Sequence, residues 1–284
     1  MNAFRAACVQ MRSGKNPSEN SLQASALIKQ AAADGATYIQ TPEMTNLLVG
    51  SKAELLDRIS AEWQDVSLKA FKRLADELSI WLHIGSLAVL REDGKIVNRA
   101  FVISPEGSVA VRYDKIHMFD VDLPGGESWR ESATYQPGNS AVCCDLPWIR
   151  FGVAICYDIR FPTLFRAQAK AGAFMLTAPA AFTQQTGQAH WHVLQRARAI
   201  ENTSFVVSAA QGGLHEDGRE TYGHSIIVSP WGDVLAELDN NEPGYMTAMI
   251  DPESSTRARQ RIPSLQNDKE FEISGDFRAA ETRA

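Results

Sequence analysis

Short apolar segments rich in β-branched residues recur along the whole chain, and they limit the fold to one that contains a large amount of sheet. Glycine-containing turns at 92–95 and 105–107 join some of these segments as hairpins, so the middle of the chain is not built of βαβ units alone. The predicted strands are Phe4–Val9, Tyr38–Thr41, Trp81–Leu90, Ala100–Ile103, Val109–Tyr113, Ala141–Asp145, Phe151–Cys156, Phe174–Thr177, Ser204–Ala209, Gly223–Val228 and Gly244–Ile250.

Helical patterns separate several of these strands. Ser18 is predicted to cap a first helix that ends near Asp34, where Gly35 can stop it. Pro162 opens a third helix that closes near Gly172. The second and fourth helices are indicated by apolar residues three and four apart, which are Trp63, Val66, Ala70, Leu74 and Leu78 in one and Trp191, Leu194, Ala197 and Ile200 in the other. These patterns predict an α/β chain in which helices cover the outside of two sheets packed face to face.

Composition excludes several classes of function. The net charge of −6 argues against a nucleic-acid-binding surface. No apolar run approaches the roughly 18 residues that a membrane span requires, and the first residues lack the features of a signal peptide. The chain has four cysteines but no CxxC pair, which weighs against a disulfide framework or a zinc site. We therefore expect a cytoplasmic protein with no membrane or nucleic-acid partner.

Three predicted strands end directly at a residue that can take part in catalysis. Glu43 follows the strand that ends near Pro42, where a sheet rim would hold a general base in place and leave it accessible. Lys115 follows the next such strand, and its charge could stabilise an oxyanion or a neighbouring thiolate. Taken alone, each of these residues is more simply a surface residue in a turn.

Cys156 ends a third strand and precedes a turn and the helix that Pro162 begins. This order resembles a nucleophile elbow, in which a sharp turn presents the side chain beside backbone N–H groups. A buried structural cysteine is the alternative, because free cysteines are often buried.

Together the three segments resemble the nitrilase, or carbon–nitrogen hydrolase, superfamily, which uses Glu, Lys and Cys in this chain order. The matching motifs are Pro42–Glu43, Tyr113–His117 and Ile155–Pro162, and the similarity continues through Ala180–Thr183, Gly187–Trp191, Arg196–Asn202 and Tyr222–Ser225 to about residue 265. The resemblance implies a four-layer α-β-β-α sandwich, which agrees with the two sheets expected from the strand pattern. It implies a catalytic domain at 1–255 and a C-terminal arm at 256–284 that lies at a dimer interface or is partly disordered.

The resemblance also implies roles for individual residues. Glu131 corresponds to a second glutamate that contacts the lysine and supports proton transfer. The Tyr157 backbone N–H would hold the oxyanion together with Lys115, and Phe182 and Thr183 would contact the substrate. The implied reaction hydrolyses a small linear amide through a thioester on the cysteine, without a metal or other cofactor.

Other residue pairs suggest chemistry that we consider less favoured. His190 and His192 are spaced by two, so on a helix they would point to nearly opposite sides and could not share one metal ion. His117 and His224 are expected to hold loops by hydrogen bonds. Cys143 and Cys144 would face opposite sides of a strand, which favours packing over redox sensing.

Within the superfamily, the segments 181–191 and 209–213 look most similar to Nit-type amidases, in particular those that act on deaminated glutathione. An omega-amidase acting on 2-oxoglutaramate or 2-oxosuccinamate and an N-carbamoyl amino acid hydrolase are the alternatives. These substrates are acidic, and Arg160 is placed to read a carboxylate because it lies four residues after Cys156. The alternative for Arg160 is a salt bridge to Asp158 or another acid.

Two further expectations concern assembly and activity. The resemblance implies a homodimer, with alanine-rich helices starting at Pro162 and Gln188 offering the contact and the tail from Arg257 wrapping the partner. A non-catalytic α/β binding module or a redox enzyme would be the alternative class of function. The former predicts damage to one of the three motif residues and the latter a resolving cysteine nearby, and neither feature is visible in the sequence.

Overall fold

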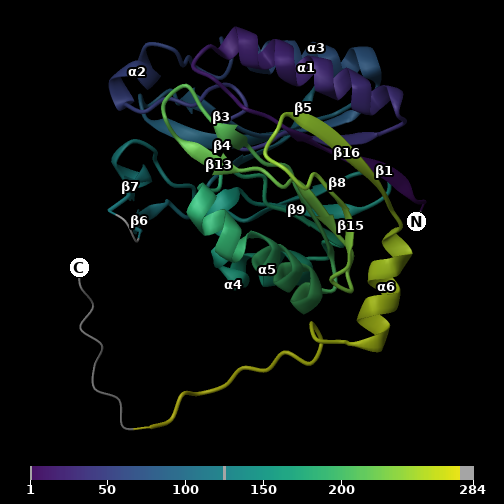
Figure 1. Cartoon of the computed structure of the whole chain (residues 1–284). Coiled ribbons are helices and arrows are strands. Elements are labelled where there is room, and N and C mark those ends of the chain that lie inside the picture. Colours follow the sequence, from purple (N-terminus) through teal and green to yellow (C-terminus); the bar gives the residue numbers. More distant parts are fainter. Residues whose placement is uncertain (1, 124–125, 276–284) are drawn as a thin grey trace.

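The computed structural model describes residues 2–123 and 126–275 and contains two six-stranded sheets (Figure 1). The first is built from β1 (Phe4–Gln10), β2 (Tyr38–Gln40), β3 (Trp81–Leu90), β4 (Ile96–Ile103), β5 (Val109–Asp114) and β16 (Gly244–Ile250). The second is built from β8 (Val142–Asp145), β9 (Arg150–Val153), β10 (Met175–Thr177), β11 (Phe205–Ser208), β14 (Ile226–Val228) and β15 (Val234–Glu237). The strand orders are β16-β1-β2-β3-β4-β5 and β15-β14-β11-β10-β9-β8.

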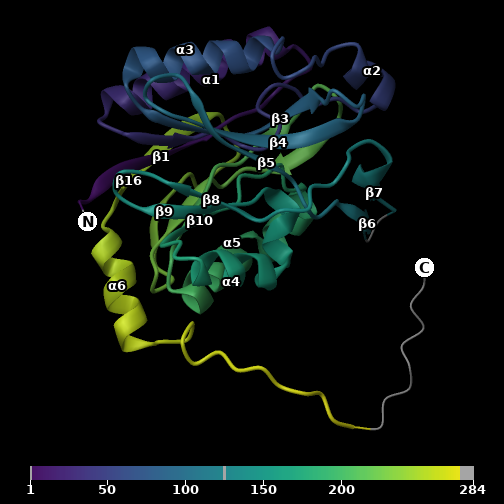
Figure 2. The same ribbon diagram turned by 180° about the vertical axis from the view of Figure 1, so that it is seen from behind.

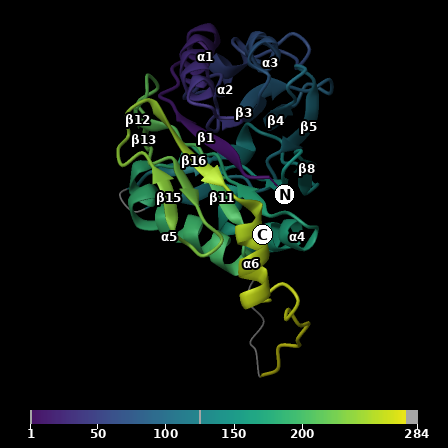
Figure 3. The same ribbon diagram turned by 90° about the vertical axis from the view of Figure 1, so that its right-hand side faces the viewer.

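Helices cover the outer face of each sheet. The first sheet carries α1 (Pro17–Ala33) and α3 (Val66–Leu78), and the second carries α4 (Pro162–Lys170) and α5 (Gln184–Asn202) (Figures 1 and 3). The two sheets face each other between these helical layers, which confirms the predicted four-layer α-β-β-α sandwich. In the described part of the chain, no helix is long and apolar enough to cross a bilayer.

Strand β1 shows how the sequence builds the layers. Ala6 and Cys8 belong to the apolar core between the two sheets, whereas Ala7 and Val9 belong to the core beneath α1 and α3. All four side chains are fully buried. Successive side chains of a strand point to opposite faces, so a continuous apolar run fits a strand that is covered on both sides.

The first helix begins earlier than predicted. Asn16, not Ser18, is its N-cap, and the Asn16 side chain accepts hydrogen bonds from the backbone N–H groups of Ser18 and Glu19. Pro17 occupies the first helical position, where its missing N–H leaves no hydrogen bond unmade. The predicted stop is correct, because Gly35 follows the helix with a left-handed φ of 84°.

The apolar stripe predicted for α3 is only partly correct, because Leu74 and Leu78 pack against the core and its other members do not. The buried face of this helix contains Ser67, Leu68, Phe71, Leu74 and Ala75. Trp63 lies before the helix and is exposed, as is Val66 in its first turn. A second set of apolar residues with nearly the same spacing therefore faces the sheet.

Several strand ends also differ from the prediction. Strand β9 ends at Val153, so Cys156 lies beyond the sheet, at the start of the short 3-10 helix η2 (Cys156–Arg160). Helix α5 begins at Gln184 and not at Gln188, because the Thr183 hydroxyl caps it by accepting from the Thr186 backbone N–H. The prediction also missed β15 and two small hairpins, β6–β7 (Asp120–Asp122 and Ser128–Arg130) and β12–β13 (Gly212–Leu214 and Glu220–Tyr222).

The C-terminal segment continues as a helix through the predicted boundary between residues 255 and 256. Helix α6 (Pro252–Arg261) buries Ser255 and Ala258, on either side of that boundary. The chain then runs along the outside of the molecule (Figure 2), where Asp268 forms an ion pair of 2.6 Å with Lys170. The rest of the predicted arm, residues 276–284, lies outside the described residues.

Replacing the observed cap should destabilise the protein, and replacing the predicted one should not. We expect Asn16→Ala to lower the free energy of unfolding by about 0.5–2 kcal/mol, because two N–H groups of the first turn lose their acceptor. Ser18→Ala changes an exposed side chain on the same turn and should stay within about 0.5 kcal/mol. Urea denaturation followed by circular dichroism measures both variants, and equal losses would contradict the assignment of Asn16 as the cap.

Candidate active site

Glu43 lies in the loop that follows β2, and the backbone of this loop is closely confined. A Cβ atom on Gly85 would come within 2.2 Å of the Thr41 carbonyl oxygen, so only glycine on β3 allows this approach. The Thr45 hydroxyl donates to the Pro42 carbonyl at 2.7 Å, which closes the turn around Glu43. The Glu43 residue is 4% exposed, and its position is therefore set by the sheet and not by solvent.

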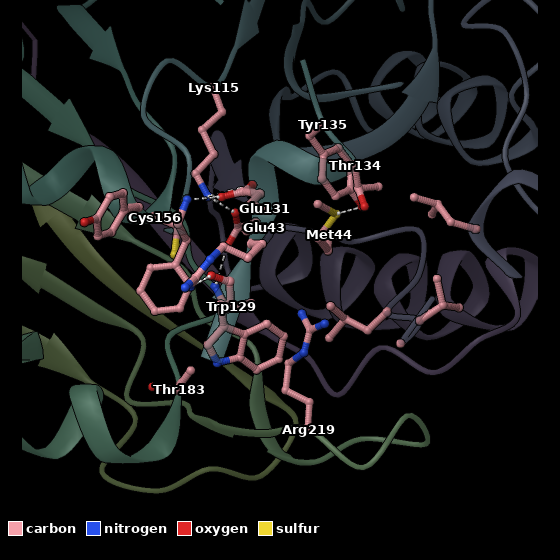
Figure 4. Close-up of a pocket in the computed structure, with 18 of the residues that line it drawn as sticks. Glu43, Met44, Lys115, Trp129, Glu131, Thr134, Tyr135, Cys156, Thr183 and Arg219 are labelled. Carbon is pink, nitrogen blue, oxygen red and sulfur yellow. Dashed lines mark hydrogen bonds and ion pairs between the residues drawn. The ribbon is translucent and has the colours of Figure 1, made fainter. Parts of the chain in front are cut away.

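Lys115 lies just beyond the end of β5 and is 2% exposed. Its Nζ contacts Glu43 Oε1 at 2.9 Å and Glu131 Oε2 at 2.8 Å, so one ammonium group bridges two carboxylates (Figure 4). Glu131 comes from the 3-10 helix η1 (Glu131–Ala133), which follows β7. The structure thus brings the predicted second glutamate into direct contact with the lysine.

Backbone and amide N–H groups complete the environment of the two carboxylates. Asn98 Nδ2 on β4 donates to Glu43 Oε1 at 2.8 Å and to Glu131 Oε1 at 3.3 Å. The N–H groups of Ala181 and Phe119 donate to Glu43 Oε2 at 2.8 Å and to Glu131 Oε2 at 2.7 Å, respectively. Sequence reasoning missed Asn98, which lies beside Arg99 in a mostly apolar strand.

Cys156 is presented by a strained turn. Its φ of 48° lies in the left-handed region, which a residue with a side chain rarely adopts. The Cys156 backbone N–H donates to the Pro179 carbonyl at 2.9 Å. The Glu43 carboxylate lies close enough to the thiol for its charge to raise the thiol pKa, so the predicted sharp turn and the predicted base meet at one cavity.

Asp158 ties this turn to the end of β5. Its carboxylate accepts from the Ile155 N–H and the Tyr113 hydroxyl on one oxygen, and from the backbone N–H and Nδ1 of His117 on the other. The His117 ring also stacks on Phe161 with a centroid separation of 3.5 Å. His117 therefore holds a loop, as predicted, and the spacing of Cys156 from Lys115 depends on Asp158.

Burial and charge give the three central groups different protonation states. Burial opposes ionisation of Glu43, but Lys115 and the hydrogen bonds outweigh it and lower the pKa of the carboxyl below its ordinary value. Burial also opposes the charged form of Lys115, yet the neighbouring carboxylates raise its pKa well above its usual range. Burial and the Glu43 charge raise the pKa of the Cys156 thiol. The resting site thus contains a carboxylate, an ammonium and a neutral thiol.

A cavity of about 350 Å³ opens beside these groups. This volume lies at the lower end of the range for small-molecule sites, which is about 300–1,000 Å³. Its wall includes all four predicted catalytic residues and also the predicted substrate contacts Tyr157, Phe182 and Thr183. Sequence reasoning missed Trp129 and Arg219, which come from the two small hairpins and lie on the side of the cavity away from Cys156 (Figure 4).

The structure does not bring Arg160 to the wall of this cavity. The Arg160 guanidinium lies over the rings of Tyr157 and Phe182, at 5.8 and 5.4 Å from their centroids, and contacts His190 at 3.2 Å. The salt bridge to Asp158 that we considered is also absent, because the oxygens of that buried carboxylate accept from three other residues. Arg160 instead packs against two rings that line the cavity, and the lining itself does not include it.

The remaining predicted polar residues lie apart from the cavity. His192 pairs with Glu237 at 2.6 Å, and His190 contacts Arg160. Cys143 is partly exposed and Cys144 buried, in agreement with their predicted alternation along β8. Within the residues that the structure describes, no group of three or more histidine, cysteine and acidic side chains could hold a metal ion.

Comparisons with known proteins agree with this geometry. A family model described as carbon-nitrogen hydrolase matches residues 5–260. The deaminated glutathione amidase of Synechocystis sp. is 39% identical over 271 residues, which cover 94% of this chain and 98% of that protein. The omega-amidase NIT2 of Homo sapiens is 37% identical over 266 residues, covering 93% and 94% of the two chains.

Solved structures share the same architecture. The C. elegans NitFhit protein superposes with a TM-score of 0.88 at 33% identity, covering 95% of this chain, which spans 66% of that longer chain. Saccharomyces cerevisiae Nit3, a member of branch 10 of the nitrilase superfamily, superposes with a TM-score of 0.83 at 29% identity, and the coverage is 92% and 94%.

Removing the cation should reverse the effect of pH on stability. In the native protein the lowered pKa of Glu43 stabilises the folded state at every pH above the ordinary carboxyl pKa. This stability is lost only as the pH falls through the lowered pKa. In Lys115→Met the carboxylates are buried without a cation, so their pKa rises and stability is lost as the pH increases. At neutral pH the loss should be about 3–5 kcal/mol.

The melting temperature, measured between about pH 5 and 8, checks this expectation. The deficit of Lys115→Met relative to the native protein should grow as the pH rises. Lys72→Met, which changes an exposed lysine on α3, should show a deficit that does not vary with pH. A constant deficit for Lys115→Met would mean that its ammonium does not control the ionisation of the buried carboxylates.

Proposed function

The chain belongs to the carbon–nitrogen hydrolase family, and we propose that it hydrolyses a small linear amide with Cys156 as nucleophile, Glu43 as general base and Lys115 as oxyanion donor. The family and the Nit-type branch predicted from the motifs are thereby confirmed, and the chain is an amidase. The observation that carries the residue roles is the meeting of a neutral thiol, a carboxylate and an ammonium at one end of a cavity.

In the first half of the reaction, Glu43 takes the proton from Cys156 as the sulfur attacks the amide carbon. A base is required because the raised pKa of the thiol leaves almost no thiolate in the resting site. The oxyanion that forms would be held by Lys115 and the Tyr157 backbone N–H, and such a donor commonly contributes a factor of about 10²–10³ in rate. Glu43 then gives its proton to the departing amine, and a thioester remains on Cys156.

In the second half, Glu43 takes a proton from water as the water attacks the thioester. The acid is released, and the proton returns to the sulfur of Cys156. Glu131 supports both halves, because its carboxylate keeps a negative charge beside the Lys115 ammonium whenever Glu43 is protonated. The ammonium therefore remains charged and in place for each oxyanion.

For the substrate, we favour an acidic amide of the deaminated glutathione type. The support is the similarity to the Synechocystis amidase of that name together with basic residues in the cavity wall. The similarity to omega-amidases keeps 2-oxoglutaramate and 2-oxosuccinamate as alternatives, and an N-carbamoyl amino acid is a more distant one. Amides of the deaminated glutathione type release a peptide-like amine, whereas 2-oxoglutaramate and 2-oxosuccinamate release ammonia. The relative kcat/KM for amides of these two kinds therefore separates the two classes of substrate.

We also propose a cellular setting, which the state of the cysteines supports. Cys8, Cys143, Cys144 and Cys156 are all free thiols in the structure. A mechanism that uses a thiol nucleophile requires that Cys156 stay reduced, and we therefore place the protein in the reducing cytoplasm.

Replacing the nucleophile should abolish hydrolysis without unfolding the protein. In Cys156→Ala a methyl group replaces a small thiol outside the sheets, so circular dichroism should be unchanged while amide hydrolysis is lost. Mass spectrometry of the native enzyme with a slow substrate should show an acyl adduct on Cys156. An active alanine variant, or an adduct on Cys8, Cys143 or Cys144, would refute the proposed nucleophile.

We also propose a homodimer, as the family resemblance implied. Helix α5 leaves Val193 and Ile200 exposed, and Trp231 is exposed on the neighbouring turn after β14, so this side of the second sheet offers apolar surface for a partner. The expected mass in solution is about twice the chain mass of 31.3 kDa. Light scattering at working concentrations measures it, and a value near that of one chain would contradict the dimer.

A further inference from the structure

The wall of the cavity contains three basic side chains besides Lys115, and they differ in how far the protein already uses them. Arg130 forms a paired contact with both carboxylate oxygens of Asp122, at 2.9 and 3.0 Å, and is half exposed. Lys52 is exposed and donates to the Ala133 carbonyl. Arg219 differs from both, because one of its donors is buried and has no partner among the described residues.

Arg219 is partly buried, and its side chain is 20% exposed. Its Nε is buried and has no hydrogen-bond partner among the described residues. The only ion-pair contact of its guanidinium there is a long one, from Nη2 to Asp217 Oδ2 at 3.4 Å. Buried polar groups are normally hydrogen-bonded, so an arginine of this kind in a cavity wall indicates a missing acceptor.

The guanidinium is held in place by contacts that leave its donors unused. It lies over the indole ring of Trp129, with the carbon of the guanidinium 4.6 Å from the ring centroid (Figure 4). This stacking orients the guanidinium plane, and the donors are left on its edges. Trp129 comes from β7 and Arg219 from the turn before β13, so the contact joins the two small hairpins at the cavity.

The backbone of Arg219 is equally well fixed. Its N–H donates to Asp217 Oδ1 at 3.0 Å, and its carbonyl accepts from the His215 N–H at 2.8 Å. His215 is itself buried and contacts the Ser13 carbonyl and the Thr221 hydroxyl through its two ring nitrogens. A side chain on such a turn loses little freedom when it binds a ligand.

We propose that Arg219 binds a carboxylate of the substrate, which makes the enzyme selective for amides that carry a negative charge away from the scissile bond. This proposal rests on the proposed function, because it assigns the far end of the same cavity. A carboxylate has two acceptor oxygens that match the planar fork of arginine, whereas the Asp217 contact is too long to occupy that fork. Arg219, on a different loop from Arg160, thus offers a carboxylate site within the lining of the cavity itself.

The test compares matched acidic and neutral amides. Glutaramic acid and its methyl ester place the charge on the acyl part, and N-butyrylglycine and its methyl ester place it on the departing amine. For Arg219→Gln we expect kcat/KM to fall by about 10- to 100-fold on the acid of the relevant pair, and to change less than threefold on its ester. Arg219→Lys should recover only part of this loss, since lysine keeps the charge but not the fork.

Arg160→Gln is the matched control, because it removes an arginine that contacts two rings of the cavity lining but does not itself line the cavity. The ratio of kcat/KM for acid and ester should stay at the native value in this variant. Binding of the acids to Cys156→Ala, measured by calorimetry with and without Arg219→Gln, separates affinity from turnover. The affinity should weaken by a similar factor when Arg219 is replaced.

The outcomes are distinguishable. A loss confined to the glutaramic acid pair or to the N-butyrylglycine pair supports the proposal and says which part of the substrate Arg219 holds. Equal losses on acid and ester, or a changed ratio in Arg160→Gln only, would overturn it while the amidase mechanism stands. If the native enzyme hydrolyses none of the four compounds and shows no acyl adduct on Cys156 with any amide, the proposed function itself fails.

Discussion

The bridge from Lys115 to Glu43 and Glu131 is the interaction on which the site depends. Two carboxylates and one ammonium are buried together, and a buried charge without a partner is far more costly than a paired one. The remaining negative charge is offset by N–H donors from Asn98, Ala181 and Phe119, which belong to three separate segments. The strands and loops that supply these groups must therefore assemble in one arrangement for any of the charges to be stable.

The sequence predicted the parts of the molecule that follow a repeating pattern. Strands such as Trp81–Leu90 and Gly244–Ile250 have the predicted bounds, because a run of mainly apolar residues is stable only where a sheet buries it. The short hairpins at β6–β7 and β12–β13 were missed, since their strands are short and mostly polar or glycine and lack the apolar run that marked the equally short β2 and β10. The buried face of α3 was predicted only in part for a related reason. Two sets of apolar residues on this helix have nearly the same spacing, and only packing against the sheet decides which set is buried.

The same distinction applies to the site. Glu43, Lys115 and Cys156 were found because each follows a strand and lies in a motif, so position along the chain was informative. Asn98 and Arg219 were not found, because their importance comes from neighbours that are distant in sequence. Arg160 lies differently from the position that its spacing suggested. Four residues of separation from Cys156 suggested a side chain over the cavity, and the structure places the guanidinium against the rings of Tyr157 and Phe182, which line the cavity.

Asp158 has a consequence for the choice of base. This carboxylate is only two residues from Cys156, yet the hydroxyl of Tyr113, the Ile155 N–H and two nitrogens of His117 already engage its oxygens. A carboxylate has about four lone-pair sites, so none is left to receive a proton from sulfur or water. Asp158, the acid nearest to Cys156 in the sequence, thus has no acceptor site left for the proton. In the proposed mechanism the proton therefore passes to Glu43, a carboxylate that follows a strand of the opposite sheet, so the reaction depends on the two halves of the sandwich staying packed together.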